Sequence, residues 1–356
     1  MNWRVKTNLL FIMMTSFLFS CALSVNQNDS KNQDWPSFGR DFGGQRFSPA
    51  NQINTSNVKN LVQAWQFKSG VVASFQATPI VQNGIMYLSL PFNHVVALDA
   101  KTGKELWRYT HERRKDWKMC CGPANRGVAV SNGRVFIGTV DARLIALNAS
   151  TGKKEWDIDV VEDAITTEGQ DSLNKDDPNS ARKVTGGTGI GIAMAPVAYK
   201  GKVIVGITGV GYGLHIDNPT ADAPLGAVIG VAGRFGRPGF LAAYDVNNGK
   251  RMWQFDTIPD KGWEGQFVDS TEDGATFNRD VTQEKIDLPK YPDAARFGGG
   301  SAWSTPAIDV ANDTLYFGTG NPSPQMNDIS RPGDNLYTVS LVALDVNTGQ
   351  RKWHYQ

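Results

Sequence analysis

Residues 97–107 read ALDAKTGKELW, and this stretch decides the fold because its pattern returns three times further along the chain. A small residue is followed two positions later by Asp or Asn, then by a turn that contains glycine, and finally by tryptophan. The later copies begin at Ala146, Ala243 and Ala343, so successive starts are 49, 97 and 100 residues apart. Recurrence at this spacing, with insertions in the later members, predicts a repeat architecture.

A second turn precedes each copy and gives every repeat two hairpins. Asn-Gly between alternating apolar residues is the strongest short hairpin signal, and strand-like runs such as Val203-Ile204-Val205 flank these turns. Two hairpins form a four-stranded antiparallel blade, in which Asp bonds the turn and Trp fills the gap between neighbouring blades. The sequence therefore predicts an all-β propeller with four blades present. The turns are Asn83-Gly84, Asn132-Gly133, Lys200-Gly201 and Asn312-Asp313.

The composition of the 356 residues fits a folded, turn-rich protein. Hydrophobic residues make up 40% and charged residues 20%, which suffices for a large core and argues against wholesale disorder. The 37 glycines, 17 prolines and 10 tryptophans are typical of many short strands joined by tight turns. Because 36 Lys and Arg face 35 Asp and Glu, the net charge of +1 argues against nucleic-acid binding, which needs a basic face.

The first residues have the features of an export signal. Arg4 and Lys6 precede a mainly apolar stretch of 11 residues, Leu9–Phe19. This stretch is shorter than the ~20 residues that a permanent transmembrane helix needs, but it suits the core of a signal peptide. Cys21 ends a sequence that resembles a bacterial lipobox; the alternative is an ordinary cleaved signal that contains a cysteine. Ala22 favours the outer membrane, and both alternatives predict a periplasmic protein.

The chain thus divides into three predicted parts. Residues 1–21 are expected to be a signal peptide of the lipoprotein type, residues 22–34 a polar linker, and residues 35–356 a partial propeller. The linker reads ALSVNQNDSKNQD and suits a tether between a lipid at Cys21 and the folded domain.

Five short segments outside the repeat are also informative: DWPSFGRD at 34–41, RFSP at 46–49, QIN at 52–54, GTGNPSP at 318–324 and RPGDNLY at 331–337. With the repeat, which resembles the tryptophan-docking motif of quinoproteins, they resemble the PQQ-dependent alcohol dehydrogenases, where PQQ is pyrroloquinoline quinone. The resemblance covers residues 35–356. It implies that the four blades belong to an eight-bladed ring that binds PQQ and oxidises an alcohol to an aldehyde or ketone.

Cys120 and Cys121 are adjacent, which is the sharpest chemical feature of the sequence. Neighbouring Cα atoms lie about 3.8 Å apart, below the usual ~4.4–6.8 Å disulfide span, so a bond between them closes a strained ring. An oxidising periplasm favours that bond; the alternative is two buried thiols that act as small hydrophobic groups. The family resemblance implies that the disulfide ring lies against one face of PQQ.

The resemblance implies cofactor contacts for Arg126 and Trp303. Arg126 lies five residues after Cys121, and a guanidinium binds carboxylates and quinone oxygens through charge-assisted hydrogen bonds. In the family this arginine contacts PQQ, and we expect it to help stabilise the charge that develops during catalysis. Trp303 ends the segment GGGSAW and would stack on the other face of PQQ. The alternatives are a surface arginine in a salt bridge and a structural tryptophan.

A calcium ion beside PQQ is also implied by the resemblance, with Asn321 as an amide ligand. The alternative for Asn321 is a turn-forming residue before proline. The sequence departs from the family at Gly211, which stands where a calcium-binding glutamate is expected and offers no side-chain oxygen. Asp217 or Asp222, in an insertion at 214–236, are candidate substitutes; the alternative is a solvent-exposed loop.

Other positions implied to contact the cofactor agree with the family only in part. Gln76 stands where many relatives have Glu, and Ala193 where they have Thr, whereas Thr208 and Gly209 are compatible with cofactor contact. The four histidines show no metal-ligand spacing, and the sequence contains no Cys-x-x-Cys-His haem motif.

The sequence ends at Gln356, before the segment in which the family carries an aspartate proposed as catalytic base. We therefore expect the base beyond Gln356, and we expect the chain to be the N-terminal piece of a longer protein that is inactive alone. The alternative is two halves that assemble into a ring, since an open ring leaves unpaired strand edges.

These features predict a periplasmic PQQ-dependent alcohol dehydrogenase. A small alcohol would pass a hydride to the quinone, and a cytochrome c or another periplasmic acceptor would receive the electrons. The alternative is a non-catalytic, lipid-anchored propeller scaffold of the outer-membrane assembly type, which the lipobox resemblance and the lost carboxylate favour. The cysteine pair, Arg126 and Trp303 count against a scaffold, because a scaffold needs no cofactor site.

Overall fold

Four antiparallel sheets, each made of four strands that are consecutive in sequence, form the fold. The structure, a computed structural model, describes residues 34–113, 123, 125–161, 169–170, 183–184, 190–208, 237–323 and 328–356. The first blade consists of β1 (Ile80–Gln82), β2 (Ile85–Ser89), β3 (Val95–Asp99) and β4 (Glu105–Tyr109), and the second of β5 (Ala129–Ser131), β6 (Arg134–Gly138), β7 (Arg143–Asn148) and β8 (Lys154–Asp159). The third blade consists of β11 (Val197–Tyr199), β12 (Lys202–Gly206), β13 (Phe240–Asp245) and β14 (Arg251–Asp256). The fourth blade consists of β15 (Ala307–Asp309), β16 (Thr314–Gly318), β17 (Leu341–Asp345) and β18 (Arg351–Tyr355).

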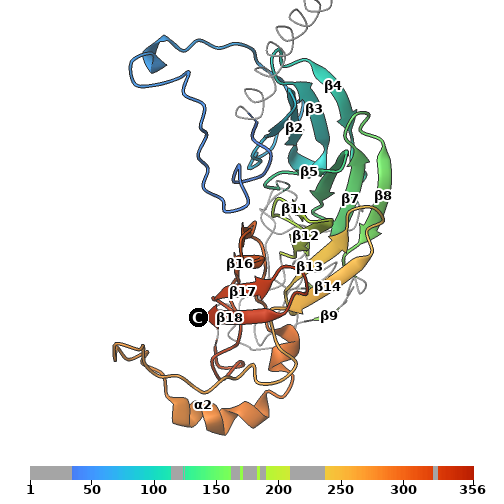
Figure 1. Cartoon of the computed structure of the whole chain (residues 1–356). Coiled ribbons are helices and arrows are strands. Elements are labelled where there is room, and N and C mark those ends of the chain that lie inside the picture. Colours follow the sequence, from blue (N-terminus) through green and yellow to red (C-terminus); the bar gives the residue numbers. More distant parts are fainter. Residues whose placement is uncertain are drawn as a thin grey trace, which may run out of the picture.

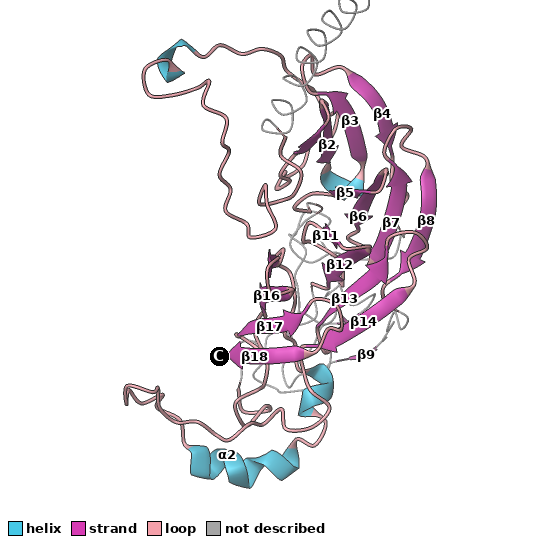
Figure 2. Cartoon of the chain, in the orientation of Figure 1, coloured by secondary structure: helices cyan, strands magenta, loops and turns pink. Residues whose placement is uncertain are grey.

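The blades follow one another along an open arc, with β4, β8 and β14 on its convex side (Figure 1). Figure 2 shows that the described helices lie outside the blades, in connections between strands and in the segment that precedes β1. No helix in the described part of the chain is long and apolar enough to cross a membrane. The remaining elements are the ribbon of β9 (Gly169–Gln170) and β10 (Lys183–Val184), the helix α2 (Val281–Asp287) and the 3-10 turns η1 (Val58–Asn60), η2 (Pro91–Asn93), η4 (Leu288–Lys290) and η5 (Ala294–Phe297).

The predicted hairpin turns join the first two strands of each blade. In the first blade Gln82 pairs with Ile85, so Asn83 and Gly84 form a two-residue loop with φ values of 52° and 77°. Two left-handed residues match the right-handed twist of the flanking strands, which is why Asn-Gly is favoured there. The second and third blades repeat this arrangement, and the four-blade, all-β prediction is confirmed.

The repeated tryptophans dock each blade onto the next, as the pattern predicts. Trp107 donates its indole N–H to the carbonyl of Ala149 at 2.9 Å, and Trp156 donates to Val246 at 3.2 Å. Trp253 donates to Val346 at 3.1 Å and lies on Gly349, where an added Cβ would come within 2.6 Å of the indole. The glycine of the motif therefore gives the neighbouring tryptophan a flat surface on which to pack.

The sequence pattern missed one docking tryptophan. Trp65 donates its indole N–H to the carbonyl of Ala100 at 3.2 Å and lies against Gly103, the turn glycine of the first blade. It thus holds the same place relative to the first blade that Trp107 holds relative to the second. No Asp-containing turn directly precedes Trp65 in the sequence, so Trp65 does not match the repeat pattern.

The core lies within and between the blades. The second and third strands are mostly buried; β12, for example, is buried at all five positions, whereas β2 is buried at two of five. One buried cluster joins the second, third and fourth blades and includes Phe136, Ile204 and Leu344. A second cluster joins the first blade to the second through Ile80 and Ile137. Burial on both faces explains why these strands read as continuous apolar runs rather than as alternating ones.

A charged contact between the third and fourth blades gives a pH prediction. Hydrogen bonds from Lys200, Tyr199 and Asn347 lower the pKa of Asp313 from 3.8 to about 2. The folded state therefore prefers the ionised carboxylate, so this contact stabilises the fold above pH 3.8 and is lost as the pH falls toward about 2. We expect Asp313→Asn to lower the melting temperature at pH 7, and the difference from wild type to shrink across that window. A difference that grows on acidification would contradict this assignment.

Candidate functional site

A chain of backbone hydrogen bonds brings the predicted site residues together. These bonds join the segments that enter the first strand of each blade. The amide of Thr78, two residues after Gln76, donates to the carbonyl of Arg126 at 2.9 Å. The amide of Arg126 in turn donates to the carbonyl of Ala193 at 2.9 Å. Gln76, Arg126 and Ala193, which the sequence assigns to one site, therefore lie on neighbouring segments.

The same arrangement continues into the third and fourth blades. The amide of Thr208 donates to the carbonyl of Gly191 at 2.8 Å, two residues before Ala193. The amide of Ala302, next to Trp303, donates to the carbonyl of Ile207, next to Thr208, at 2.9 Å. The carbonyl of Asn321 accepts from Gly300 at 2.9 Å. These hydrogen-bonded segments form one series that spans the four blades, and we call this series the inner edge. Six predicted positions lie on or beside it: Gln76, Arg126, Ala193, Thr208, Trp303 and Asn321.

Arg126 and Trp303 are in direct contact although 177 residues separate them. The guanidinium carbon lies 4.9 Å from the centroid of the indole. Nη1 donates to the carbonyls of Ala193 at 3.2 Å and of Trp303 at 3.4 Å. Burial lowers the pKa of Arg126, and among the described residues no carboxylate pairs with it. Within the described part of the chain, the guanidinium of Arg126 therefore keeps donors for an anionic ligand, which such a group binds through charge-assisted hydrogen bonds.

Trp303 is not a docking tryptophan of the repeat. Its side chain is 44% exposed, whereas the docking tryptophan Trp253 is 8% exposed. Gly299 and Gly300, shortly before it, have φ values of 81° and 73°, and a Cβ at Gly299 would lie 2.6 Å from the carbonyl of Asn321. Only glycine fits this close approach, so the GGG segment fixes how the indole is presented beside Arg126.

Several predictions fall on positions outside the described residues. These are Cys21, the pair Cys120 and Cys121, Gly209, and Gly211 with its candidate substitutes Asp217 and Asp222. The disulfide and the missing carboxylate therefore stay predictions. The described residues contain no group of three or more His, Cys, Asp or Glu side chains that could hold a metal. Asn321 is exposed and offers one amide oxygen.

Sequence reasoning missed two groups that hold this inner edge in place. Asn125, 2% exposed, donates to the carbonyl of Gly138 at 2.9 Å and accepts from the amide of Gly127 at 3.3 Å. Thr305 Oγ1 accepts from the amide of Ala195 and donates to its carbonyl, both at 3.1 Å. The Asn that directly precedes Arg126 in the sequence was the available signal for the first group.

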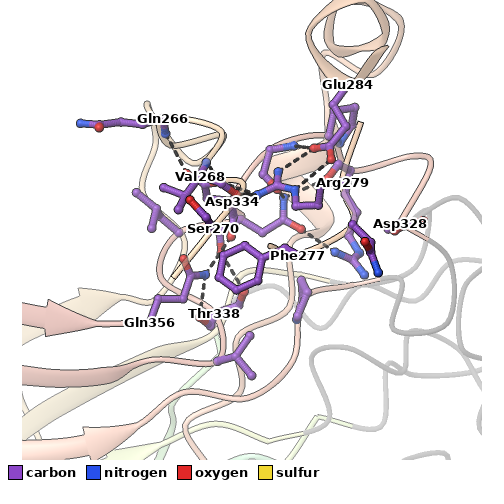
Figure 3. Close-up of a pocket in the computed structure, with 18 of the residues that line it drawn as sticks. Gln266, Val268, Ser270, Phe277, Arg279, Glu284, Asp328, Asp334, Thr338 and Gln356 are labelled. Carbon is purple, nitrogen blue, oxygen red and sulfur yellow. Dashed lines mark hydrogen bonds and ion pairs between the residues drawn. The ribbon is translucent and has the colours of Figure 1, made fainter. Parts of the chain in front are cut away.

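A cavity of about 1080 Å³ has none of the six inner-edge residues in its lining and is formed by the segment around α2 and by the β16–β17 connection (Figure 3). Arg279 binds both carboxylate oxygens of Glu284, at 2.9 and 2.7 Å, and donates to Asp334 at 2.8 Å. Asp334 also accepts three backbone amides, which include that of Val268 at 2.9 Å. Arg279 lowers the pKa of Glu284, and these charged groups satisfy one another, so they clamp the α2 segment onto the fourth blade.

Comparison with known proteins agrees with this geometry. Four-stranded blades joined by docking tryptophans, with an arginine and a partly exposed indole at their inner edge, are the arrangement that the resemblance to quinoproteins predicts. The family described as "Glucose/ethanol/alcohol dehydrogenase, beta-propeller domain" matches residues 35–356, and the chain belongs to this family.

Named relatives and solved structures point the same way. The quinohemoprotein alcohol dehydrogenase ADH IIB of Pseudomonas putida is 34% identical, over 99% of this chain and 44% of its own. The crystal structure of the quinohemoprotein alcohol dehydrogenase of Comamonas testosteroni has a TM-score of 0.66 at 32% identity, over 93% of this chain and 42% of its own. A europium-containing methanol dehydrogenase has a TM-score of 0.67 at 28% identity, over 92% and 50%. The chain thus spans half or less of the length of these relatives.

Proposed function

We propose that this chain supplies a PQQ-binding half-site of an alcohol dehydrogenase. The observation that carries the proposal is the contact between Arg126 and Trp303, with the guanidinium 4.9 Å from a 44% exposed indole. PQQ is flat and carries three carboxylates, so it matches a partly exposed indole beside a half-buried cation that no described carboxylate neutralises. A propeller that serves only as a scaffold needs neither the exposed indole of Trp303 nor the half-buried cation of Arg126.

The described residues bind and orient the cofactor. Trp303 offers its face for stacking, and Arg126 binds oxygens at the edge of the ring system through N–H donors. The carbonyl of Ala193, which accepts both the backbone and the side chain of Arg126, fixes the direction of the guanidinium. When bound, PQQ supplies a quinone that accepts a hydride from an alcohol. Arg126 would stabilise negative charge that develops at a neighbouring oxygen during this reaction.

Among the described residues, Asn321 is the predicted calcium ligand. Calcium takes six to eight oxygen ligands, and Asn321 offers one. Since the described residues add no carboxylate cluster at this edge, we assign the metal no step in the reaction. We propose calcium only as an ion that would rest on Asn321 and on groups outside the described residues.

The remaining features of the proposed activity rest on the sequence resemblance and on the first residues of the chain. The substrate would be a small alcohol, oxidised to an aldehyde or ketone, and the electron acceptor a periplasmic cytochrome c or similar protein. We place the protein in the periplasm, with a lipid anchor at Cys21, because of the signal-like sequence of residues 1–21. A catalytic base supplied from beyond Gln356 would make this chain inactive alone, although able to bind PQQ.

Titration of the full chain with PQQ tests the proposal. We expect saturable binding, seen as a change in quinone absorbance, and no alcohol turnover. Trp303→Ala should weaken binding about 10-fold, because stacking on an aromatic face contributes up to about 1.5 kcal/mol beyond the buried area, and about 1.4 kcal/mol corresponds to a factor of ten. Trp353→Ala, which removes an exposed tryptophan of the fourth blade, serves as the control and should leave the affinity unchanged. A folded chain that binds no PQQ would overturn the proposal.

A further inference from the structure

The β6–β7 turn is held by a buried amide from the preceding blade. Asn93 is 0% exposed; its Nδ2 donates to the carbonyl of Gly138 at 3.2 Å, and its Oδ1 accepts from the amide of Val140 at 2.8 Å. The side-chain amide of Asn93 thus pairs with a backbone C=O and a backbone N–H, as a neighbouring strand would. It ties the first blade to the second at this turn.

The same turn holds both segments that position Arg126. The carbonyl of Gly138 also accepts from Asn125, the residue before Arg126, at 2.9 Å. The carbonyl of Thr139 accepts from the amide of Ile192 at 2.8 Å, and the residue after Ile192 binds the backbone and side chain of Arg126. Residues 138–140 therefore connect Asn93 to the two segments that position Arg126, one through Asn125 and the other through Ile192.

The backbone around Asn93 has an unusual conformation that serves this contact. Phe92 and Asn93 are both left-handed, with φ values of 62° and 63°. Asn tolerates this region, whereas Phe adopts it rarely, so other contacts must hold the turn in this shape. One of them is the amide of Phe92, which donates to the carbonyl of Pro123 at 2.9 Å. The turn thereby points the side-chain amide of Asn93 into the second blade.

We propose that Asn93 is a positioning residue for Arg126: its amide fixes residues 138–140, and these hold the arginine against Trp303. Asn93 does not itself touch the cofactor site. The part of the test that uses PQQ rests on the proposed function, whereas the spectroscopic part does not.

Two variants of the full chain separate the amide from the backbone. Asn93→Gly permits the left-handed conformation and removes the side chain. Asn93→Asp keeps the shape and the acceptor for Val140 but replaces the N–H donor with an oxygen that faces the carbonyl of Gly138. Both variants should displace Arg126 from Trp303, and the Asn93→Asp variant should do so only while its carboxyl is ionised.

The near-ultraviolet circular dichroism of Trp303 is the readout that needs no cofactor. Its contribution is the difference between each protein and the same protein with Trp303→Phe. We expect Asn93→Gly, and Asn93→Asp at a pH at which its carboxyl is ionised, to change this difference spectrum as Arg126→Met does. PQQ affinity should fall about 10-fold in parallel.

Protonation gives a conservative rescue. Burial raises the pKa of a carboxyl, and the introduced carboxyl of Asn93→Asp, once protonated, can again donate to Gly138. The Trp303 signal and the PQQ affinity of Asn93→Asp should therefore recover toward wild type as the pH falls through this raised pKa, while those of Asn93→Gly should not. His94, His111, Arg113 and Asp141 lie on the segments packed around this turn, so the wild type is measured at each pH as reference.

Asn132→Asp is the matched control, because Asn132 is a left-handed residue with φ of 50° in an exposed turn. It should leave the Trp303 signal unchanged.

If Asn93 variants fail to fold, Asn125→Ala removes the other amide on Gly138 and must give the same altered signal. The proposal is overturned if folded Asn93 or Asn125 variants keep the wild-type Trp303 spectrum, or if acid does not restore Asn93→Asp. If wild type binds no PQQ but the Trp303 arm behaves as expected, only the proposed function fails.

Discussion

The Arg126→Met variant is expected to bind PQQ about 100-fold more weakly than wild type. Methionine keeps much of the side-chain volume and removes the charge and the N–H donors. A hydrogen bond to a charged group contributes about 1.5–3 kcal/mol, and 1.4 kcal/mol corresponds to a factor of about ten in affinity. Since Arg126 is half-buried and, among the described residues, pairs only with carbonyl oxygens, its loss should not be offset by another cation. Equilibrium titration by quinone absorbance measures the effect.

Arg134→Met provides the control for this result. Arg134 forms an ion pair with Glu155 at 2.6 Å on β6 and β8, away from the inner edge. Its loss should change PQQ affinity less than two-fold, because it removes a surface ion pair worth at most about 1 kcal/mol to stability. Equal effects of the two substitutions would mean that net charge, rather than the position of Arg126, attracts the cofactor.

The Trp253→Ala variant is expected to lose about 3–5 kcal/mol of unfolding free energy, the range for large-to-small changes of buried aromatic residues. Trp253 is 8% exposed, donates to the carbonyl of Val346 and packs on Gly349 of the fourth blade. Its removal leaves a cavity and an unpaired carbonyl at a blade junction. Denaturant unfolding, followed by far-ultraviolet circular dichroism, measures the loss.

Trp353→Ala tests the same residue type at the equivalent position of the fourth blade. Trp353 is 42% exposed, and its described ring neighbour is Tyr316 at 5.8 Å. We expect a loss of no more than about 1 kcal/mol, since substitutions at exposed positions have small effects. A loss as large as that of Trp253→Ala would show that docking onto the next blade does not account for the contribution of these tryptophans to the free energy of unfolding.

Local patterns were enough to predict the blades. Asn83-Gly84 and its counterparts require left-handed backbone, and the Asp-turn-Trp pattern places an indole at a fixed distance from a turn; both signals lie within about ten residues. Trp65 escaped the prediction because its own turn is absent, although its contact with Gly103 is the same. The local signal therefore failed where only half of the motif is present.

The site could be predicted only through resemblance to a family. Arg126 and Trp303 meet across 177 residues, and no local spacing encodes that contact. The bracing by Asn93 and Asn125 was missed for a related reason. A buried asparagine in a loop resembles any turn residue until its partner, 45 residues away in the case of Asn93, is known. Long-range polar contacts of this kind are visible in three dimensions alone.

A crystal structure of the full chain with PQQ tests the central claim most directly. We predict that the ring system of PQQ lies parallel to the indole of Trp303 and that at least one of its oxygens accepts a hydrogen bond from Arg126. PQQ bound at another place, or an indole of Trp303 that remains free of it in the complex, would contradict the account.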